Sequence, residues 1–205
     1  MFDWMLPATH AISILKKDHD TVEALFAEFE QCKTAAAKEK VIEQAVRALK
    51  IHATLEEELF YPAVRAHIGS KIMNEADEEH HVAKVLIAEL DQTDRSNDHR
   101  DAKFTVLAES VRHHIDEEEH QMLPKSKAVD IDFEALGQQM LDRRTELLAF
   151  DVPADAEHAM VAKANGHADS PATAARRRKS PTARKKPTAK VSASHQRKTS
   201  VHGRH

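Results

Sequence analysis

Apolar residues recur every three or four positions in five separate stretches of the first 150 residues. This spacing lines up apolar side chains on one face of a helix, so each stretch predicts an amphipathic α-helix. The predicted helices cover roughly residues 9–29, 41–59, 78–90, 104–122 and 133–150. Pro62 and Pro124 follow the second and fourth helices, which we expect to end or bend there. The chain has only four glycines, and sheets need frequent turn residues, so the pattern predicts an all-α fold.

The first four predicted helices form two copies of one helical hairpin. "HATLEEELFYP" (52–62) matches "HIDEEEHQMLP" (114–124) at an offset of 62 positions. "KDHDTVEALFAEF" (17–29) matches "EEHHVAKVLIAEL" (78–90) at an offset of 61, which pairs His19 with His80. An offset of 62 would pair His19 with His81 instead, but it loses three other matches. We therefore favour His80 as the equivalent of His19 and keep His81 as the alternative.

A repeated His-x-x-x-Glu pair lies on the apolar faces of the second and fourth predicted helices. Residues four apart share one face of a helix, and a buried carboxylate without a partner is costly. A mutual hydrogen bond would account for one isolated pair. The repeat in register, with one histidine on each remaining helix, instead favours a metal site. The candidate ligands are His19, His52, Glu56, His80, His114 and Glu118. Four imidazoles and two carboxylates suit a pair of iron or manganese ions bridged by carboxylates.

Other histidines and acids near these residues carry weaker signals. Glu57 and Glu119 directly follow the two candidate glutamates, and the sequence leaves open whether they orient the imidazoles or face solvent. The remaining histidines near the site or the helix ends lie off the apolar stripes. We expect these six to be surface residues: His10, His67, His81, His99, His113 and His120.

Charge divides the chain into two parts. Residues 1–150 contain 18 basic and 30 acidic residues, a net charge of −12, whereas residues 151–205 contain 12 and 4, a net charge of +8. From position 170 onward there are 11 basic residues, no acidic residue and no Phe, Tyr or Trp. We therefore predict a helical domain over 1–150 and a disordered basic tail over 151–205. The tail is interpreted as a solvated extension, a non-specific contact to DNA or another polyanion, or a segment lying against the acidic domain.

Cysteine content and hydropathy bear on the compartment. The single cysteine, Cys32, cannot form an internal disulfide, which is typical of a reducing compartment. The amino-terminal residues lack the pattern of a signal peptide, and no apolar run is long enough for a membrane span. We therefore expect a cytoplasmic protein without a membrane partner.

The motifs "LKKDH", "HATLEEELFYP", "EEHHVAKVLIAEL" and "HIDEEEHQMLP" resemble those of hemerythrin-like proteins of the bacterial HHE cation-binding type, over roughly residues 8–125. The resemblance implies an up-down-up-down four-helix bundle, here with an additional C-terminal helix. It also implies a centre of two non-haem iron ions, with manganese or zinc as substitutes, held by the six candidate ligands. Ferritin-like di-iron proteins use Glu-x-x-His pairs instead, which this chain does not match.

The chain departs from the oxygen-carrying hemerythrins at two positions. Lys84 stands where those proteins place a second histidine on the third helix, and a His-x3-Glu pair replaces their final His-x4-Asp motif. One ligand fewer leaves an open position for dioxygen, peroxide or nitric oxide. The leading hypothesis is a protein that binds or senses dioxygen or a related small oxidant. The alternatives are an enzyme that consumes peroxide or nitric oxide, and a DNA-associated protein that protects DNA by holding iron.

Overall fold

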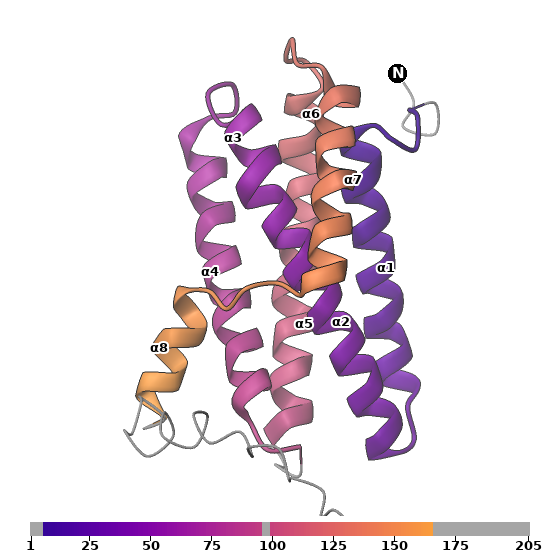
Figure 1. Cartoon of the computed structure of the whole chain (residues 1–205), viewed down its shortest axis with the longest axis vertical. Helices are drawn as coiled ribbons and strands as arrows, with labels where there is room; N and C mark the ends of the chain where they lie inside the picture. Colours follow the sequence, from indigo (N-terminus) through magenta and orange to yellow (C-terminus); the bar gives the residue numbers. More distant parts are fainter. Residues whose placement is uncertain (1–5, 96–98, 166–205) are drawn as a thin grey trace, which may run out of the picture. The chain divides into compact units, whose positions relative to one another are not determined.

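The structure is a computed structural model that describes residues 6–95 and 99–165, all within one compact unit, Met1–Ala168. Within these residues the regular elements are all helices, which confirms the predicted all-α fold (Figure 1). Four long helices form the bundle: α1 Ala11–Gln31, α2 Ala35–Leu55, α4 Ser70–Gln92 and α5 His99–Glu117. Helix α1 packs against α2, and α4 against α5. The two predicted hairpins are therefore present, and consecutive helices run in opposite directions.

The helices that carry the repeated motif do not end at their prolines. Helix α2 continues through a π-helical segment, η2 Glu56–Phe60, into α3 Tyr61–Val64, and α5 continues through η3 Glu118–Met122 into α6 Leu123–Ser126. The N–H groups of Tyr61 and Leu123 donate to the carbonyl oxygens of Glu56 and Glu118, five residues back. A proline lacks an N–H and cannot close an α-helical hydrogen bond, so the wider π turn lets the helix pass it.

Two apolar clusters lie on either side of a layer of buried polar residues. One cluster includes Leu15, Leu55 and Met122, and the other includes Val22 and Leu49. The buried histidines and glutamates fall between these positions along each helix. The bundle is therefore closed by apolar packing at both ends, which fixes the backbone around its polar centre.

Two further helices follow the bundle. Helix α7, Phe133–Phe150, packs against α1 and α2 and is the additional helix that the sequence predicts (Figure 1). Gly137 permits this close approach, because a Cβ there would lie 1.9 Å from the backbone oxygen of Thr9. Helix α8, Ala156–Ala164, begins at Asp155, whose side chain accepts a hydrogen bond from the His158 backbone N–H, and it packs against α4.

The sequence grouped residues 151–165 with the basic tail, but they lie on the helical unit. Their aspartate cap and the buried Val161 provide a helix start and a small apolar contact that the charge count did not weigh. Residues 166–205, which the sequence also predicts to be disordered, lie outside the residues that the structure describes. Among the described helices, none has the length and apolar character needed to cross a membrane.

Candidate metal centre

The six residues predicted as ligands come together in the polar layer of the bundle. Each of them is at most 7% exposed to solvent: His19, His52, Glu56, His80, His114 and Glu118. One residue comes from α1, one from α2, one from α4 and one from α5, while each π segment contributes its first residue, a glutamate. The repeat thus becomes a pseudo-two-fold arrangement in which each half of the bundle provides two imidazoles and one carboxylate.

The six residues form two groups of possible metal ligands that share one carboxylate. The first group contains His19, His52, Glu56 and Glu118, and the second contains Glu56, His80 and His114. Within each group, one ligand atom from every residue lies within 4.8 Å of the others. A carboxylate shared by two clusters of imidazoles could contact two adjacent ions.

Several buried polar atoms of the centre lie close together without forming hydrogen bonds. The unsatisfied atoms include Nε2 of His19 and His52 and both carboxylate oxygens of Glu56 and Glu118. The distance from His19 Nε2 to Glu118 Oε2 is 3.1 Å, and Glu56 Oε2 is 3.2 Å from Nε2 of both His52 and His80.

These distances are those expected between two donors of one metal ion. Two ligand atoms that are each about 2.1 Å from one ion lie about 3.0–3.4 Å apart when they subtend a right or tetrahedral angle. Buried polar atoms are normally hydrogen-bonded, so a concentration of unsatisfied lone pairs requires another partner. The residues present therefore fit metal cations, and the mixed imidazole and carboxylate donors suit iron, manganese or zinc.

A carboxylate holds the other nitrogen of each imidazole. When Nδ1–H donates to a carboxylate, Nε2 keeps its lone pair free for a metal ion. The Nδ1-to-oxygen distances are 2.9 Å for His19 to Glu119, 3.4 Å for His52 to Asp18, 2.9 Å for His80 to Glu57 and 2.8 Å for His114 to Glu79. All four imidazoles thus present Nε2 to the centre.

The sequence singled out two of these four carboxylates without deciding their role. It left Glu57 and Glu119 open between an orienting role and solvent, and the structure places both against imidazoles of the candidate ligands. It missed Asp18 and Glu79, although each directly precedes a candidate histidine at the same place in the repeat. Three of the four carboxylates are themselves held by cations, with Lys16 3.1 Å from Glu119, Lys84 3.0 Å from Glu57 and Arg144 2.5 Å from Asp18.

Tyr61 is a further residue of the centre that the sequence did not indicate. Its buried hydroxyl lies 3.0 Å from Nε2 of His80 and 3.4 Å from Nε2 of His114. In an α-helix a residue five positions after Glu56 would point well away from it, but the π segment places Tyr61 one turn above Glu56. The equivalent position in the second repeat is Leu123, so the two halves of the centre differ.

The charges of the centre shift the pKa values of its members. Burial alone lowers the pKa of His19 and His80, but the carboxylates of Glu118 and Glu119 beside His19, and those of Glu56 and Glu57 beside His80, raise both to about 10. Burial raises the pKa of Glu56, but the nearby imidazoles outweigh burial and hold it below the usual value. Protons and metal ions therefore compete for the same nitrogens.

The remaining histidines lie outside the six-residue cluster. The side chain of His81 is 48% exposed and lies 2.8 Å from Glu157 of α8, so the structure brings His80 to the centre and His81 to the surface. His113 and His120 are exposed, as are His67 and His99. His10 differs from the expectation, because it is partly buried, caps α1 and stacks on Phe133.

Comparisons with known proteins agree with this geometry. Residues 10–126 match the family model of the hemerythrin HHE cation binding domain. The crystal structure of a hemerythrin HHE cation binding domain-containing protein from Mycobacterium kansasii covers 71% of this chain and 95% of its own, with a TM-score of 0.58 and 24% identity. It shows the shared fold.

A protein of Nostoc sp. named DNA nickase is 28% identical over 106 residues, which are 52% of this chain. The match spans 30% of that relative's length.

Proposed function

The chain belongs to the family of hemerythrin HHE cation-binding domains, and we propose that its buried centre holds two non-haem iron ions and binds or senses dioxygen or a related small oxidant. The observation that carries the proposal is the sharing of Glu56 between two groups of buried, unsatisfied ligand atoms. Manganese or zinc would use the same donors. The single cysteine remains in accord with a reducing, cytoplasmic location.

The proposed ligand roles follow the two groups. His19, His52 and Glu118 hold the first ion, His80 and His114 hold the second, and Glu56 lies between them. Tyr61 offers the second group an oxygen, at a spacing like that between the other ligand atoms. The four orienting carboxylates keep the imidazoles in place and keep each proton on Nδ1.

The two groups do not have the same donors, which supports a reactive rather than a passive centre. The second group has one carboxylate and two imidazoles, whereas the first has two of each. An iron pair supplies the electrons for reducing dioxygen or peroxide when it is bound. The pKa of Tyr61 lies well above its ordinary value because of burial and the nearby Glu56 and Glu118, so its hydroxyl holds a proton beside the second group.

Metal content and ligand spectroscopy test the proposal. We expect about two iron ions per chain, a sharp loss in His80→Ala and little loss in the neighbouring control His81→Ala. After anaerobic purification, stopped-flow spectra with dioxygen, peroxide and nitric oxide should show which ligand changes the iron absorption. Equal metal loss in both variants would refute the ligand assignment. Sustained turnover of peroxide or nitric oxide would favour the enzyme alternative.

Substitution of Lys84 tests whether the protein carries dioxygen reversibly or reacts with it. Lys84 occupies the position at which the oxygen carriers have a histidine, and its ammonium lies 3.0 Å from Glu57. We expect a transient spectral change with dioxygen in the unmodified protein and measurable consumption of peroxide. Lys84→His should slow the decay of this spectral change, because it adds an imidazole beside the proposed iron centre. A stable and fully reversible change in the unmodified protein would favour a carrier instead.

DNA association is a second candidate function, and we propose that the basic tail would provide it. The specific observation is the 11 basic and no acidic residues from position 170 onward, alongside a relative that is named DNA nickase. A full-length chain should bind duplex DNA at low salt, and a chain that ends at position 168 should not, at unchanged iron content. The logarithm of the binding constant should fall against the logarithm of salt by about 0.9 per phosphate neutralised. Unchanged binding after truncation would refute this role.

A further inference from the structure

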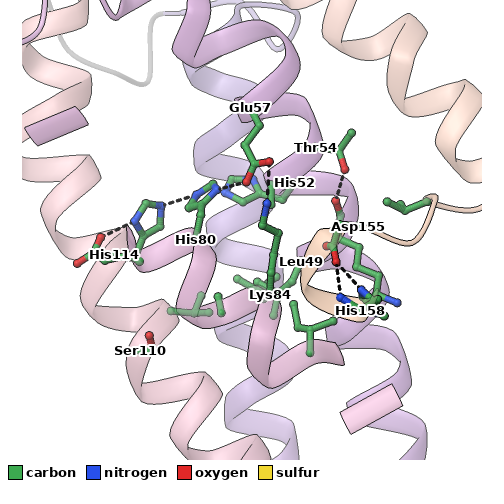
Figure 2. A pocket seen from close by; sticks show the side chains of 18 of the residues that line it. Leu49, His52, Thr54, Glu57, His80, Lys84, Ser110, His114, Asp155 and His158 are labelled. Carbon is green, nitrogen blue, oxygen red and sulfur yellow. Dashed lines mark hydrogen bonds and ion pairs between the residues drawn. The ribbon is translucent and has the colours of Figure 1, made fainter. Parts of the chain in front are cut away.

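A cavity of about 260 Å³ lies beside the candidate metal centre (Figure 2). The imidazoles of His52, His80 and His114 form its inner wall, and Figure 2 shows His80 between His114 and Glu57. A bulk water occupies about 30 Å³, and an engineered apolar cavity of about 150 Å³ binds benzene. Dioxygen, peroxide and nitric oxide each have two heavy atoms, so the cavity is far larger than these ligands require.

The cavity is closed partly by residues that follow the matched family domain. Its apolar walls come from Leu49 and Ala53 on α2, Ala83 on α4 and Val111 on α5, and residues 152–154 cover one side. The family match ends at residue 126. The cavity is therefore lined by the four-helix bundle and, on one side, by residues that follow the matched domain.

The covering segment leads into α8, which is fixed to α4. Asp151 directly precedes it, ends α7 and has a positive φ of 60°. At the other end, His158 of α8 lies 2.8 Å from Asp91 on α4, and Glu157 lies 2.8 Å from His81. These contacts hold residues 152–154 over the cavity.

The charges of the wall favour a neutral occupant. The two lysines of the wall are already paired, since Lys84 is 3.0 Å from Glu57 and Lys50 is 2.5 Å from Asp91. The carboxylates of Glu58, Glu79 and Asp155 also line the cavity, and they are paired with Arg143, His114 and His158. An organic anion would find no unpaired lysine in the lining to compensate its charge, so its transfer from water would be unfavourable.

We propose that this cavity binds a neutral organic molecule whose apolar body fills the space and whose single hydroxyl or hydroperoxyl oxygen faces the imidazoles. Because the cavity exceeds one that holds benzene, a body of about six to ten heavy atoms fits it. The position of the oxygen rests on the proposed function, since a metal ion at the imidazoles would attract it. The burial of the apolar body depends only on the walls.

Calorimetry on the purified, full-length, metal-containing protein tests the proposal, with 2-phenylpropan-2-ol as the probe and benzoate as the anionic comparison. We expect saturable binding of the alcohol at one site per chain, and binding of benzoate at least about tenfold weaker, or about 1.4 kcal/mol. Absence of saturable alcohol binding would overturn the proposal. Equal or tighter binding of benzoate would overturn the preference for a neutral ligand.

Two wall variants locate the binding. Ala53→Leu and Ala83→Leu fill the cavity from different helices, and Ala24→Leu places the same change on the exposed face of α1. Each wall variant should weaken alcohol binding at least about tenfold, or about 1.4 kcal/mol, while the control retains it. A crystal structure of the unmodified protein with the probe gives an independent readout if a variant fails to fold. Equal loss in the control, or a probe bound elsewhere, would overturn the assignment.

Metal content measured on the same samples separates this inference from the proposed function. Two ions per chain without alcohol binding would refute the cavity and leave the iron centre intact. Alcohol binding in a protein that takes up no metal would refute the proposed function and support the apolar site.

Discussion

Glu56→Gln removes the one carboxylate that both ligand groups share. Glutamine has nearly the same shape, so the change removes charge and a ligand oxygen without opening a cavity. Glu118→Gln makes the same change at the equivalent position of the repeat, but Glu118 belongs to the first group alone. Glu58→Gln is the matched control, because Glu58 lies in the same π segment and is exposed.

The structure allows the size of the effect to be worked out. Glu56 Oε2 lies 3.2 Å from Nε2 of both His52 and His80, so its loss should weaken the binding of both proposed ions together. Removing a partner that only orients a ligand typically costs 10- to 100-fold in metal affinity. Loss of a direct ligand should therefore exceed about 100-fold for each ion, or about 2.7 kcal/mol. The second group would retain two imidazoles and no carboxylate.

The assay is metal content after iron loading and gel filtration, together with anaerobic iron titration. We expect about two ions per chain in the unmodified protein and in Glu58→Gln, about one in Glu118→Gln, and fewer than one in Glu56→Gln. Metal binds the folded chain in preference to the unfolded one, so the rise in Tm on adding iron should follow the same order. Circular dichroism of each variant checks that the bundle is folded.

Two outcomes would refute this reasoning. Equal metal content in Glu56→Gln and Glu118→Gln would show that Glu56 is not shared between the ions. Two retained ions in Glu56→Gln would show that the unsatisfied oxygens serve another purpose.

Three further predictions follow from the same geometry. Glu79→Gln should weaken metal affinity about 10- to 100-fold, because it loosens the imidazole of His114, while the exposed control Glu78→Gln should not; competition with a chelator measures both. Gly137→Ala should lower the Tm although alanine has the higher helix propensity, because its Cβ would lie 1.9 Å from the backbone oxygen of Thr9. Thermal unfolding measures whether the Tm falls or rises. The pKa values of the buried His19 and His80 imidazoles are raised from 6.5 to about 10 in the folded chain. The metal-free protein should therefore lose stability as pH rises from about 6.5 through 10, which denaturation at several pH values measures. Metal binding near neutral pH should release protons, which calorimetry in different buffers measures.

The sequence by itself was sufficient for the all-α fold, the two hairpins and the family. Helical periodicity is a local property, and an internal repeat of 61 or 62 positions constrains how two halves pack. The His-x-x-x-Glu spacing places His52 with Glu56 on one helical face before any tertiary contact is known. The same spacing and the repeat brought together all six candidate residues that the structure finds buried at one place.

The tertiary structure alone decided which groups act on the imidazoles and where they do so. Glu57 reaches His80 and Glu119 reaches His19 across the two hairpins, contacts that no spacing along one helix predicts. Tyr61 joins the centre because a π turn changes the residue spacing at a proline, a backbone change that a regular helical pattern does not show.

The cavity also exists only in the folded chain. Its walls come from separate helices, and its cover comes from residues 152–154, which charge alone grouped with a tail. A cavity depends on the distances between side chains that are remote in sequence. Local pattern sets the face on which a side chain lies, but packing between elements decides what that face meets.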